Sequence, residues 1–370
     1  MSADLAPLFR PFECKSLKLR NRVAMAPMTR NFSPGQVPTE EVAGYYRRRA
    51  EGEVGLLITE GTTVGHPGAP GHDSVPAFHG EAALNGWKEV VRQVHAANGA
   101  IIPQLWHVGG TRRPGVGPDK DAPGYSPSGL FKPGKPNGEA MTLQDIEDVI
   151  QAFADSARAA REIGFDGVEI HGAHGYLLDQ FFWEGTNQRD DQYGGSLENR
   201  ARFGVEVVRA VREAVGEDFA IVLRYSQWKQ QDYEARLAHA PEELERFLGL
   251  FVDAGVDVFH ASTRRFWTPE FEGSDLNLAG WTRKLTGKPV ISVGSVGLDD
   301  DFIGANNQGI GGNANPKGIE DLAKRMAADE FDLIAVGRAL LQDPNWLVKM
   351  RNGQHDEIEP FTKAALGSLS

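Results

Sequence analysis

The alternation of short apolar runs with amphipathic segments constrains the fold of this chain most. Segments with apolar residues at three-to-four spacing separate most of the runs, at positions 39–50, 82–98, 143–163, 196–215, 241–254 and 319–328. Strands that alternate with helices predict a parallel sheet. The apolar runs number eight, which predicts a closed (β/α)8 TIM barrel, and they lie at 23–28, 55–61, 100–106, 167–171, 220–225, 258–262, 289–294 and 333–336.

The length of the chain fits one such barrel. It has 370 residues, and barrels of this kind run from about 200 to over 400 residues. Hydrophobic residues make up 41% of the chain and charged residues 24%, so a large core can form. We therefore expect a single α/β domain over 1–370, with an N-terminal extension before the first strand.

Charge and cysteine content limit the partners. The formal net charge is −12, which disfavours a nucleic-acid binder, because phosphate contacts need a basic face. The one cysteine, Cys14, excludes an internal disulfide, a thiolate zinc site and an iron–sulfur cluster. The first residues lack a signal-peptide pattern, and no apolar stretch is as long as a membrane span. We expect a cytoplasmic monomer or homodimer without membrane or nucleic-acid partners.

Two irregular stretches interrupt the alternation. Residues 109–138 follow the third run and are rich in Gly, Pro, Ser and Lys, which favours a long, lid-like loop over the mouth of the barrel. An insertion without a role is the alternative. Residues 304–318 are rich in Gly and Asn but lack the GxGxxG order, so a solvated loop is a better interpretation than a dinucleotide site.

His171 ends the fourth run and His174 and Tyr176 follow it, at the end of a barrel where chemistry occurs. Both imidazoles can meet one ligand if the chain turns after His171, and they can then donate two hydrogen bonds to one oxygen. A phenol with an ordinary pKa of about 10 stays protonated and can supply a proton. A backbone-bonded core histidine, a structural tyrosine, or a metal-ligand pair helped by Glu169 are the competing interpretations.

Other chemistry-bearing residues also end predicted strands. Gly294-Ser295 and Gly337-Arg338 follow the last two runs, where barrels commonly bind a phosphate, although Arg338 fits a structural role equally well. Four more residues suit the polar edge of an isoalloxazine ring, with the arginine placed to stabilise negative charge: Thr29, Gly61, Gln104 and Arg224.

Together these residues resemble the old yellow enzyme family of FMN-dependent ene-reductases. The similarity extends from near Leu8 to Pro344, and its most specific element is DDQYGGSLENRARF at 190–203, which we expect to be a turn and a helix start. Ala26 to Arg30 and Gln104 to His107 add to it. The resemblance implies a non-covalently bound FMN, NAD(P)H as reductant, no metal, and ping-pong reduction of the activated C=C bond of α,β-unsaturated carbonyl or nitro compounds.

The resemblance also implies a role for each site residue. Tyr176 would be the proton donor, His171 and His174 would bind the substrate oxygen, and Trp106 would shape the substrate cavity. Thr29 would bind the substrate as well and would tune the potential of the flavin through a hydrogen bond. The remaining residues would bind FMN, at the ring (Pro27, Met28, Thr29, Gly61, Gln104 and Arg224) or at the phosphate (Gly294, Ser295, Gly337 and Arg338).

Three features leave alternatives open. Phe361 stands where the family often has a tyrosine that faces the substrate, which puts the substrate range in doubt. Phe266 and Trp267 either roof the cavity or pack elsewhere. A non-redox barrel acting on a phosphorylated substrate also explains Arg338 and the histidines, but it gives Thr29 and Gln104 no shared task. A flavin-binding module without turnover is a third possibility.

Overall fold

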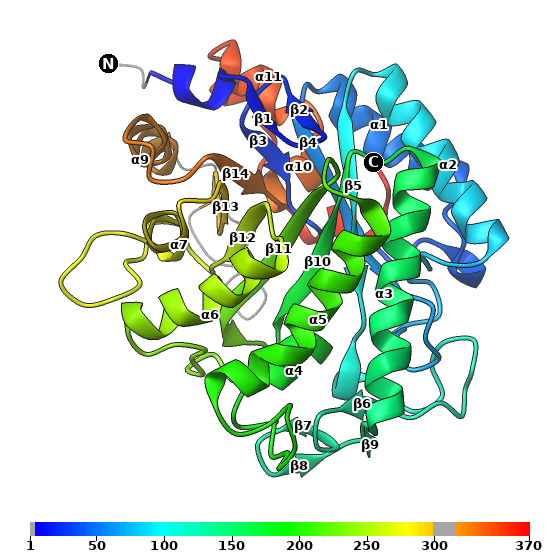
Figure 1. Cartoon of the computed structure of the whole chain (residues 1–370). Helices are drawn as coiled ribbons and strands as arrows, with labels where there is room; N and C mark the ends of the chain where they lie inside the picture. Colours follow the sequence, from blue (N-terminus) through cyan, green and yellow to red (C-terminus); the bar gives the residue numbers. More distant parts are fainter. Residues whose placement is uncertain (1–3, 299–315) are drawn as a thin grey trace.

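The computed structural model describes residues 4–298 and 316–370, and these contain a closed barrel of eight parallel strands (Figure 1). The last strand pairs with the first and closes the barrel. This confirms the predicted (β/α)8 TIM barrel. The strands follow one another in chain order: β3 (Val23–Met25), β4 (Leu56–Thr63), β5 (Ala100–Trp106), β10 (Gly167–His174), β11 (Ala220–Lys229), β12 (Val258–Ser262), β13 (Val290–Val293) and β14 (Leu333–Val336).

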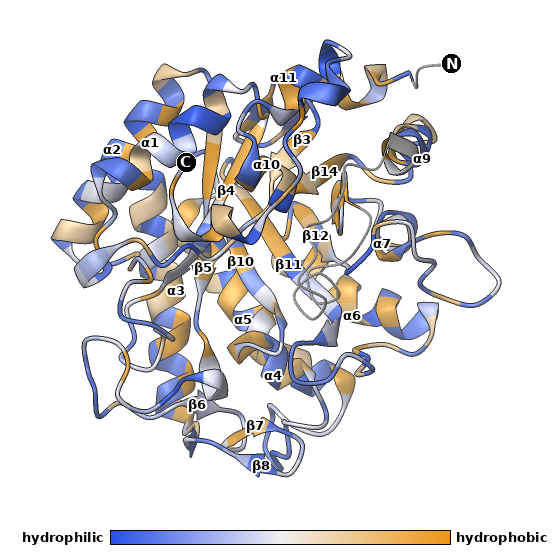
Figure 2. Cartoon of the chain, turned by 180° about the vertical axis from the view of Figure 1, so that it is seen from behind, coloured by the Kyte–Doolittle hydropathy of each residue, from blue (hydrophilic) through white to orange (hydrophobic). Residues whose placement is uncertain are grey.

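Helices surround the barrel, and Figure 2 shows hydrophobic strands at the centre with helices of mixed hydropathy around them. One of them, α7, falls where we expected no helix. None of the helices in the described ranges is long and apolar enough to cross a membrane. The outer helices are α1 (Glu40–Glu51), α2 (Glu81–Ala96), α3 (Leu143–Ile163), α5 (Leu197–Val215), α6 (Pro241–Ala254), α7 (Leu278–Thr286) and α9 (Pro316–Ala327), and the shorter ones are α4 (Leu177–Phe182), α10 (Arg338–Gln342) and α11 (Trp346–Arg351).

A small hairpin closes the amino end of the barrel. Its strands, β1 (Phe12–Cys14) and β2 (Leu17–Leu19), are antiparallel. Phe12, Leu17 and Leu19 are buried in one cluster with the inward-facing residues of the barrel strands, such as Leu56 and Val222. The N-terminal extension therefore seals the end of the barrel opposite to the strand ends where chemistry is expected.

The stretch 109–138 is folded and forms two short strand pairs. Strand β6 (Tyr125–Ser126) pairs with β9 (Glu139–Ala140), and β7 (Leu130–Lys132) pairs with β8 (Lys135–Pro136). Buried Arg112 donates to the carbonyl oxygens of Pro70 and Ala122 and ties the stretch together. The other irregular stretch, 304–318, lies outside the described residues except for its last positions, which begin α9.

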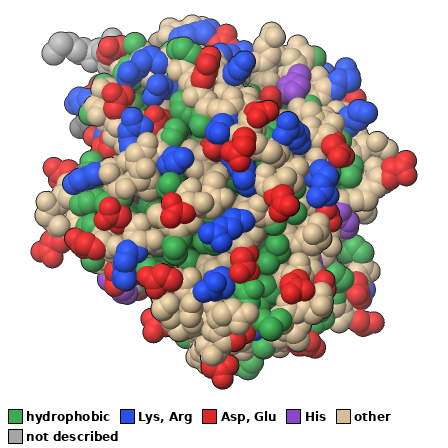
Figure 3. All heavy atoms as spheres, in the orientation of Figure 1, with side chains coloured by type: hydrophobic (Ala, Val, Ile, Leu, Met, Phe, Trp, Pro, Cys, Tyr) green, Lys and Arg blue, Asp and Glu red, His purple; other side chains and the backbone are tan. Residues whose placement is uncertain are grey.

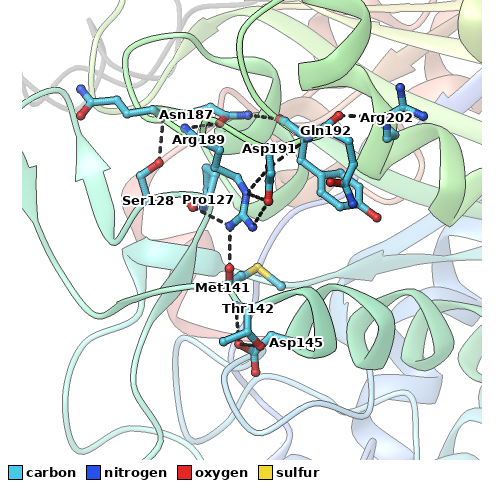
Figure 4. Close-up of polar contacts among 12 residues, drawn as sticks. Pro127, Ser128, Met141, Thr142, Asp145, Asn187, Arg189, Asp191, Gln192 and Arg202 are labelled. Atoms are coloured by element: carbon cyan, nitrogen blue, oxygen red, sulfur yellow. Dashed lines mark hydrogen bonds and ion pairs between the residues drawn. The ribbon is translucent and has the colours of Figure 1, made fainter.

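The family-like segment at 190–203 is a turn followed by a helix start, as expected. Ser196 precedes α5 and its hydroxyl accepts from the N–H of Asn199. Arg189 forms a bidentate ion pair with Asp191 and donates to the carbonyl oxygens of Pro127 and Met141, so the turn holds the stretch before α3 (Figure 4).

The close approach of chain segments in this turn needs a glycine. A Cβ at Gly194 would lie 2.0 Å from the carbonyl oxygen of Arg189.

The surface of the molecule is mixed in charge. On the face drawn in Figure 3, acidic and basic side chains are interspersed over the surface.

Candidate active site

A cavity of about 390 Å3 lies at the carboxyl ends of the barrel strands. Residues from seven of the eight strand ends line it, and β4 is the exception. Residues 109–138 do not line it, so nothing in the structure shows them acting as a lid. The cavity brings together all but one of the predicted site residues: Pro27, Met28, Thr29, Gln104, Trp106, His171, His174, Tyr176, Arg224, Gly294, Ser295, Gly337 and Arg338.

Gly61 is the predicted site residue that does not line the cavity. It lies behind Trp106, because a Cβ at position 61 would come within 2.6 Å of the indole ring. The absence of a side chain at Gly61 lets the indole pack against β4. Trp106 in turn lines the cavity and contacts the ring of Tyr176 edge-on, with 4.9 Å between ring centroids.

The two histidines face each other at the end of β10. Their ring centroids are 5.2 Å apart and the rings are perpendicular. We expected the chain to turn after His171, but β10 continues through His174. The register of its pairing with β11 shifts between Gly172 and His174, and His174 has a left-handed backbone with φ of 65°. This bulge turns His174 to the same side as His171, whereas residues three apart on a regular strand face opposite sides.

Both imidazoles are neutral near pH 7. Burial is the main cause that lowers the pKa of His171 and of His174 well below the ordinary value, and the nearby Arg224 guanidinium lowers both further. Nδ1 of His171 accepts from the N–H of Ala173 at 3.3 Å, so Nε2 of His171 carries the proton. His171 is therefore a neutral hydrogen-bond donor.

Ser262 determines the tautomer of His174. Nε2 of His174 lies 2.7 Å from the hydroxyl oxygen of Ser262, and Arg224 donates to that oxygen at 3.4 Å. Because Arg224 only donates, the Ser262 hydroxyl is available to donate its own proton to Nε2 of His174. We assign the remaining ring proton to Nδ1 on this basis.

Tyr176 completes the group. Its ring centroid is 5.2 Å from that of His171. Its hydroxyl oxygen accepts from the amide Nε2 of Gln230 at 3.1 Å, which leaves the phenolic proton available to another acceptor. Burial raises the pKa of Tyr176 above its ordinary value, so the phenol is protonated at neutral pH.

A buried carboxylate links three other side chains below the cavity. One oxygen of Glu169 accepts from the Nε2 amide of Gln104 at 2.7 Å, and the other lies 2.6 Å from Nδ1 of His260. Glu169 also attracts the Arg224 guanidinium electrostatically. Glu169 is thus engaged by these neighbours, and no cluster of three or more His, Cys, Asp or Glu side chains that could hold a metal ion occurs in the described ranges.

The residues after β13 that line the cavity have an unusual backbone. Gly294 has φ of 146°, and a Cβ there would lie 2.8 Å from the carbonyl oxygen of Thr263. Ser295 has φ of 50°. Buried Arg338 lies with Nη2 3.4 Å from the Ser295 hydroxyl and with its guanidinium over the ring of Phe361, 5.8 Å from the centroid. Phe361 is thus beside the arginine, not among the lining residues.

Other residues of the cavity were not predicted from the sequence. Trp228 stacks on the His174 ring, with centroids 4.6 Å apart and 26° between the ring planes. Arg224, Ser226 and Trp228 are every second residue of β11 and therefore share one face of the strand. Strand periodicity thus identifies Trp228 once β11 is known to extend to Lys229. Phe266 and Trp267 pack edge-on against each other and do not line the cavity. The unpredicted lining residues include Arg30, Gln230, Ser262, Thr263, Arg264 and Leu366.

The chemistry of the lining fits a flat, polar-edged ring with an anionic tail. Nε of Arg224 is buried and has no hydrogen-bond partner among the described residues, as expected of a donor placed for a ligand. The amide of Gln104 points its N–H2 at Glu169, so its carbonyl oxygen is left to accept. Isoalloxazine offers a matching N–H and carbonyl edge, and Arg338 with Ser295 offers donors for a phosphate.

Comparison with known proteins gives a consistent result. The sequence model of the NADH:flavin oxidoreductase / NADH oxidase family matches residues 7–310. NADH oxidase of Thermoanaerobacter brockii is 33% identical over 98% of this chain and 53% of its own length. The protein YqiG of Bacillus subtilis (strain 168), named as a probable NADH-dependent flavin oxidoreductase, is 32% identical over 98% of this chain and 92% of its own length.

A 12-oxophytodienoate reductase 7 of Oryza sativa subsp. japonica is 42% identical over 58% of this chain and 57% of its own length. The chain thus spans about half the length of this reductase and of the NADH oxidase. Among solved structures, morphinone reductase in complex with tetrahydroNAD superimposes with a TM-score of 0.80 at 29% identity, over 97% of this chain and 93% of its own. An old yellow enzyme homologue from Zymomonas mobilis gives 0.79 at 26% identity, over 97% and 96%.

Proposed function

Because the chain belongs to the NADH:flavin oxidoreductase / NADH oxidase family, the old yellow enzyme family, we propose that it reduces the activated C=C bond of α,β-unsaturated carbonyl or nitro compounds. FMN is its cofactor and a reduced nicotinamide nucleotide is its reductant. We propose that residues 1–370 act as one FMN-binding barrel domain, as a monomer or homodimer in the cytoplasm, with NAD(P)H as the reductant.

Hydride transfer from the nucleotide, and then onto the β-carbon of the alkene, is the chemistry that FMN supplies when bound. Thr29, Gln104 and Arg224 would hold the ring, with Pro27 and Met28 beside it. The backbone N–H groups of Gly294, Ser295 and Gly337 and the guanidinium of Arg338 would hold the phosphate. Gly61 would act through Trp106, since its missing side chain makes room for the indole.

The observation that carries the proposal is the arrangement of His171, His174 and Tyr176 around one cavity. Two neutral N–H donors can stabilise negative charge that develops on a carbonyl or nitro oxygen. The Tyr176 hydroxyl, already accepting from Gln230, can give its proton to the α-carbon. Both half-reactions would use this one cavity in turn, in a ping-pong cycle.

A double variant tests this assignment. In His171→Ala with His174→Ala, kcat/KM for 2-cyclohexenone should fall by about 100-fold or more, because the oxygen loses both donors. The FMN content per chain should stay that of the unmodified protein. His239→Ala is the matched control, since His239 is exposed and precedes α6. An unchanged rate in the double variant would remove the role given to the histidines.

A further inference from the structure

The carboxyl-terminal segment forms part of the cavity wall, although it is far from the barrel strands in sequence. Leu366 belongs to the short 3-10 helix η5 (Lys363–Gly367) and lines the cavity. The residue is also 41% exposed. A large apolar side chain that borders both the cavity and the solvent lies at the mouth of the cavity.

Arg30 holds this segment in place. Its Nη2 lies within hydrogen-bond distance of three backbone carbonyl oxygens, those of Ala365 at 3.1 Å, Leu366 at 3.3 Å and Ser368 at 2.6 Å. The guanidinium also lies over the ring of Tyr45, 5.4 Å from its centroid. Arg30 is buried, and hydrogen bonds from a buried cation are stronger than neutral ones.

Two neighbouring arginines extend the contact. Arg48 donates to the carbonyl oxygen of Leu369. Buried Arg49 donates to the carbonyl oxygens of Leu340, Leu341 and Ser370, so it links α10 to the end of the segment. Three arginines therefore fix the backbone of 365–370 against α1 and the loop after β3.

The position of Arg30 connects this anchor to the reaction site. Arg30 follows Pro27, Met28 and Thr29 directly and itself lines the cavity. Its backbone N–H donates to Glu60 at 2.8 Å, which fixes it at the strand ends. Arg30 thus directly follows the segment 27–29, which we place beside the flavin. Arg30 also fixes the position of Leu366 at the mouth of the cavity.

We infer that Leu366, held in place by Arg30, determines how large a substrate the cavity accepts, with Arg30 as its positioning residue. The inference rests on the proposed function only for the class of ligand, a cyclic ketone or enone. A smaller side chain at 366 widens the mouth, and a larger one narrows it. In an apolar pocket, a change of a few carbons alters discrimination by about tenfold to 100-fold.

Ligand binding tests the inference without turnover. We would titrate the FMN-containing protein with cyclohexanone and with 4-phenylcyclohexanone and follow the flavin absorbance. In Leu366→Ala the preference for the larger ketone should rise by about tenfold, and in Leu366→Trp it should fall by a similar factor. The control is Leu143→Ala, because Leu143 is also an exposed leucine, at the start of α3, and does not line the cavity.

Proteolysis tests the anchor separately. Trypsin should release residues 364–370 faster from Arg30→Gln than from the unmodified protein, as read by mass spectrometry. Arg48→Gln provides a second variant with its own contact to the segment. Equal cleavage in all three proteins would overturn the role of the arginines, and a ketone preference that stays within about twofold in both Leu366 variants would overturn the role of Leu366.

The two proposals fail in distinguishable ways. If the protein does not reduce 2-cyclohexenone but the ketone preference shifts as stated, the proposed function is wrong and the inference on Leu366 holds. If enones are reduced and the preference does not shift, the inference on Leu366 is wrong.

Discussion

The Nε2 amide of Gln104 donates to Glu169 over 2.7 Å, entirely within the buried part of the barrel. This bond fixes which end of the amide faces the cavity. Glu169 also attracts Arg224 and so offsets part of the positive charge beside the proposed flavin position. A carboxylate that does not line the cavity thereby sets both the orientation of Gln104 and the electrostatic balance of the site.

Glu169→Gln should make the flavin easier to reduce. The substitution removes a negative charge close to Arg224, so the uncompensated guanidinium stabilises the negative charge of reduced flavin. We expect the two-electron midpoint potential to rise by about 30 mV, which corresponds to about 1.4 kcal/mol. An anaerobic dye titration measures it. A potential that stays the same or falls would contradict this function of Glu169.

Tyr176→Phe should separate the two half-reactions. Reduction of the flavin by nucleotide should continue, because no proton from Tyr176 is needed. Turnover of 2-cyclohexenone should fall by about 100-fold or more, and that of a nitroalkene should fall less, since its reduced intermediate is stabilised by the nitro group. Gln230→Leu should give a smaller defect of the same kind, because the phenol remains but loses the partner that orients it. Equal loss for both substrates would contradict proton donation.

The histidines predict a flat pH profile. Burial lowers the pKa of His171 and of His174 well below the ordinary value, so both stay neutral as the pH falls through 6.5. The kcat/KM for 2-cyclohexenone should therefore show no inflection between about pH 6 and 8 that arises from these residues. An inflection near 6.5 that disappears in the double variant would show that one of the pair titrates normally.

Glu60 should make stability decrease with rising pH. Burial raises the pKa of Glu60 from 4.5 to about 7. The folded protein then binds this proton more tightly than the unfolded chain does, so the contribution of Glu60 to stability is largest below pH 4.5 and is lost as the pH rises toward 7. The loss is at most about 1.4 kcal/mol per pH unit.

Urea unfolding of the FMN-bound protein at pH 5 and pH 8 checks this. The free energy of unfolding of Glu60→Gln should depend less on pH over this interval than that of the unmodified protein. The same difference between the two pH values in both proteins would show that Glu60 has an ordinary pKa.

Arg338→Ala should weaken FMN binding through the phosphate. Loss of a cationic donor to a phosphate should raise the dissociation constant of FMN by about 10- to 100-fold. Riboflavin has no phosphate, so its affinity should change little. Fluorescence titration of flavin-free protein with each ligand makes the comparison. A parallel loss of riboflavin affinity would indicate that Arg338 has a structural role beside Phe361.

Much of the fold could be predicted because strand ends carry local signals. The runs at 100–106, 258–262 and 333–336 match β5, β12 and β14 residue for residue. The strand at 220 was predicted to end at 225, so Trp228 was assigned outside it. The longer β11 is held by pairing with β10 up to the partners His174 and Lys229, and sequence periodicity does not reveal such tertiary pairing.

Most of the predicted site residues line one cavity for the same reason. Barrel geometry collects strand ends around one mouth, which brings His171, Arg224 and Arg338 together from positions far apart in sequence. Leu366 was not predicted because it lies on no strand. The contact of Arg30 with its backbone holds it at the cavity. Gly61 was predicted as a site residue but does not line the cavity, because the indole of Trp106 fills the space in front of it.

Anaerobic double-mixing stopped flow tests the central claim most directly. The purified protein is first mixed with NADH or NADPH and then with 2-cyclohexenone, while flavin absorbance is followed. We predict that the flavin bleaches in the first step and recovers in the second, and that the recovery is slower by about 100-fold or more in the variant lacking both histidines. A protein that contains no FMN, or whose bleached flavin is not reoxidised by the enone, would contradict the account.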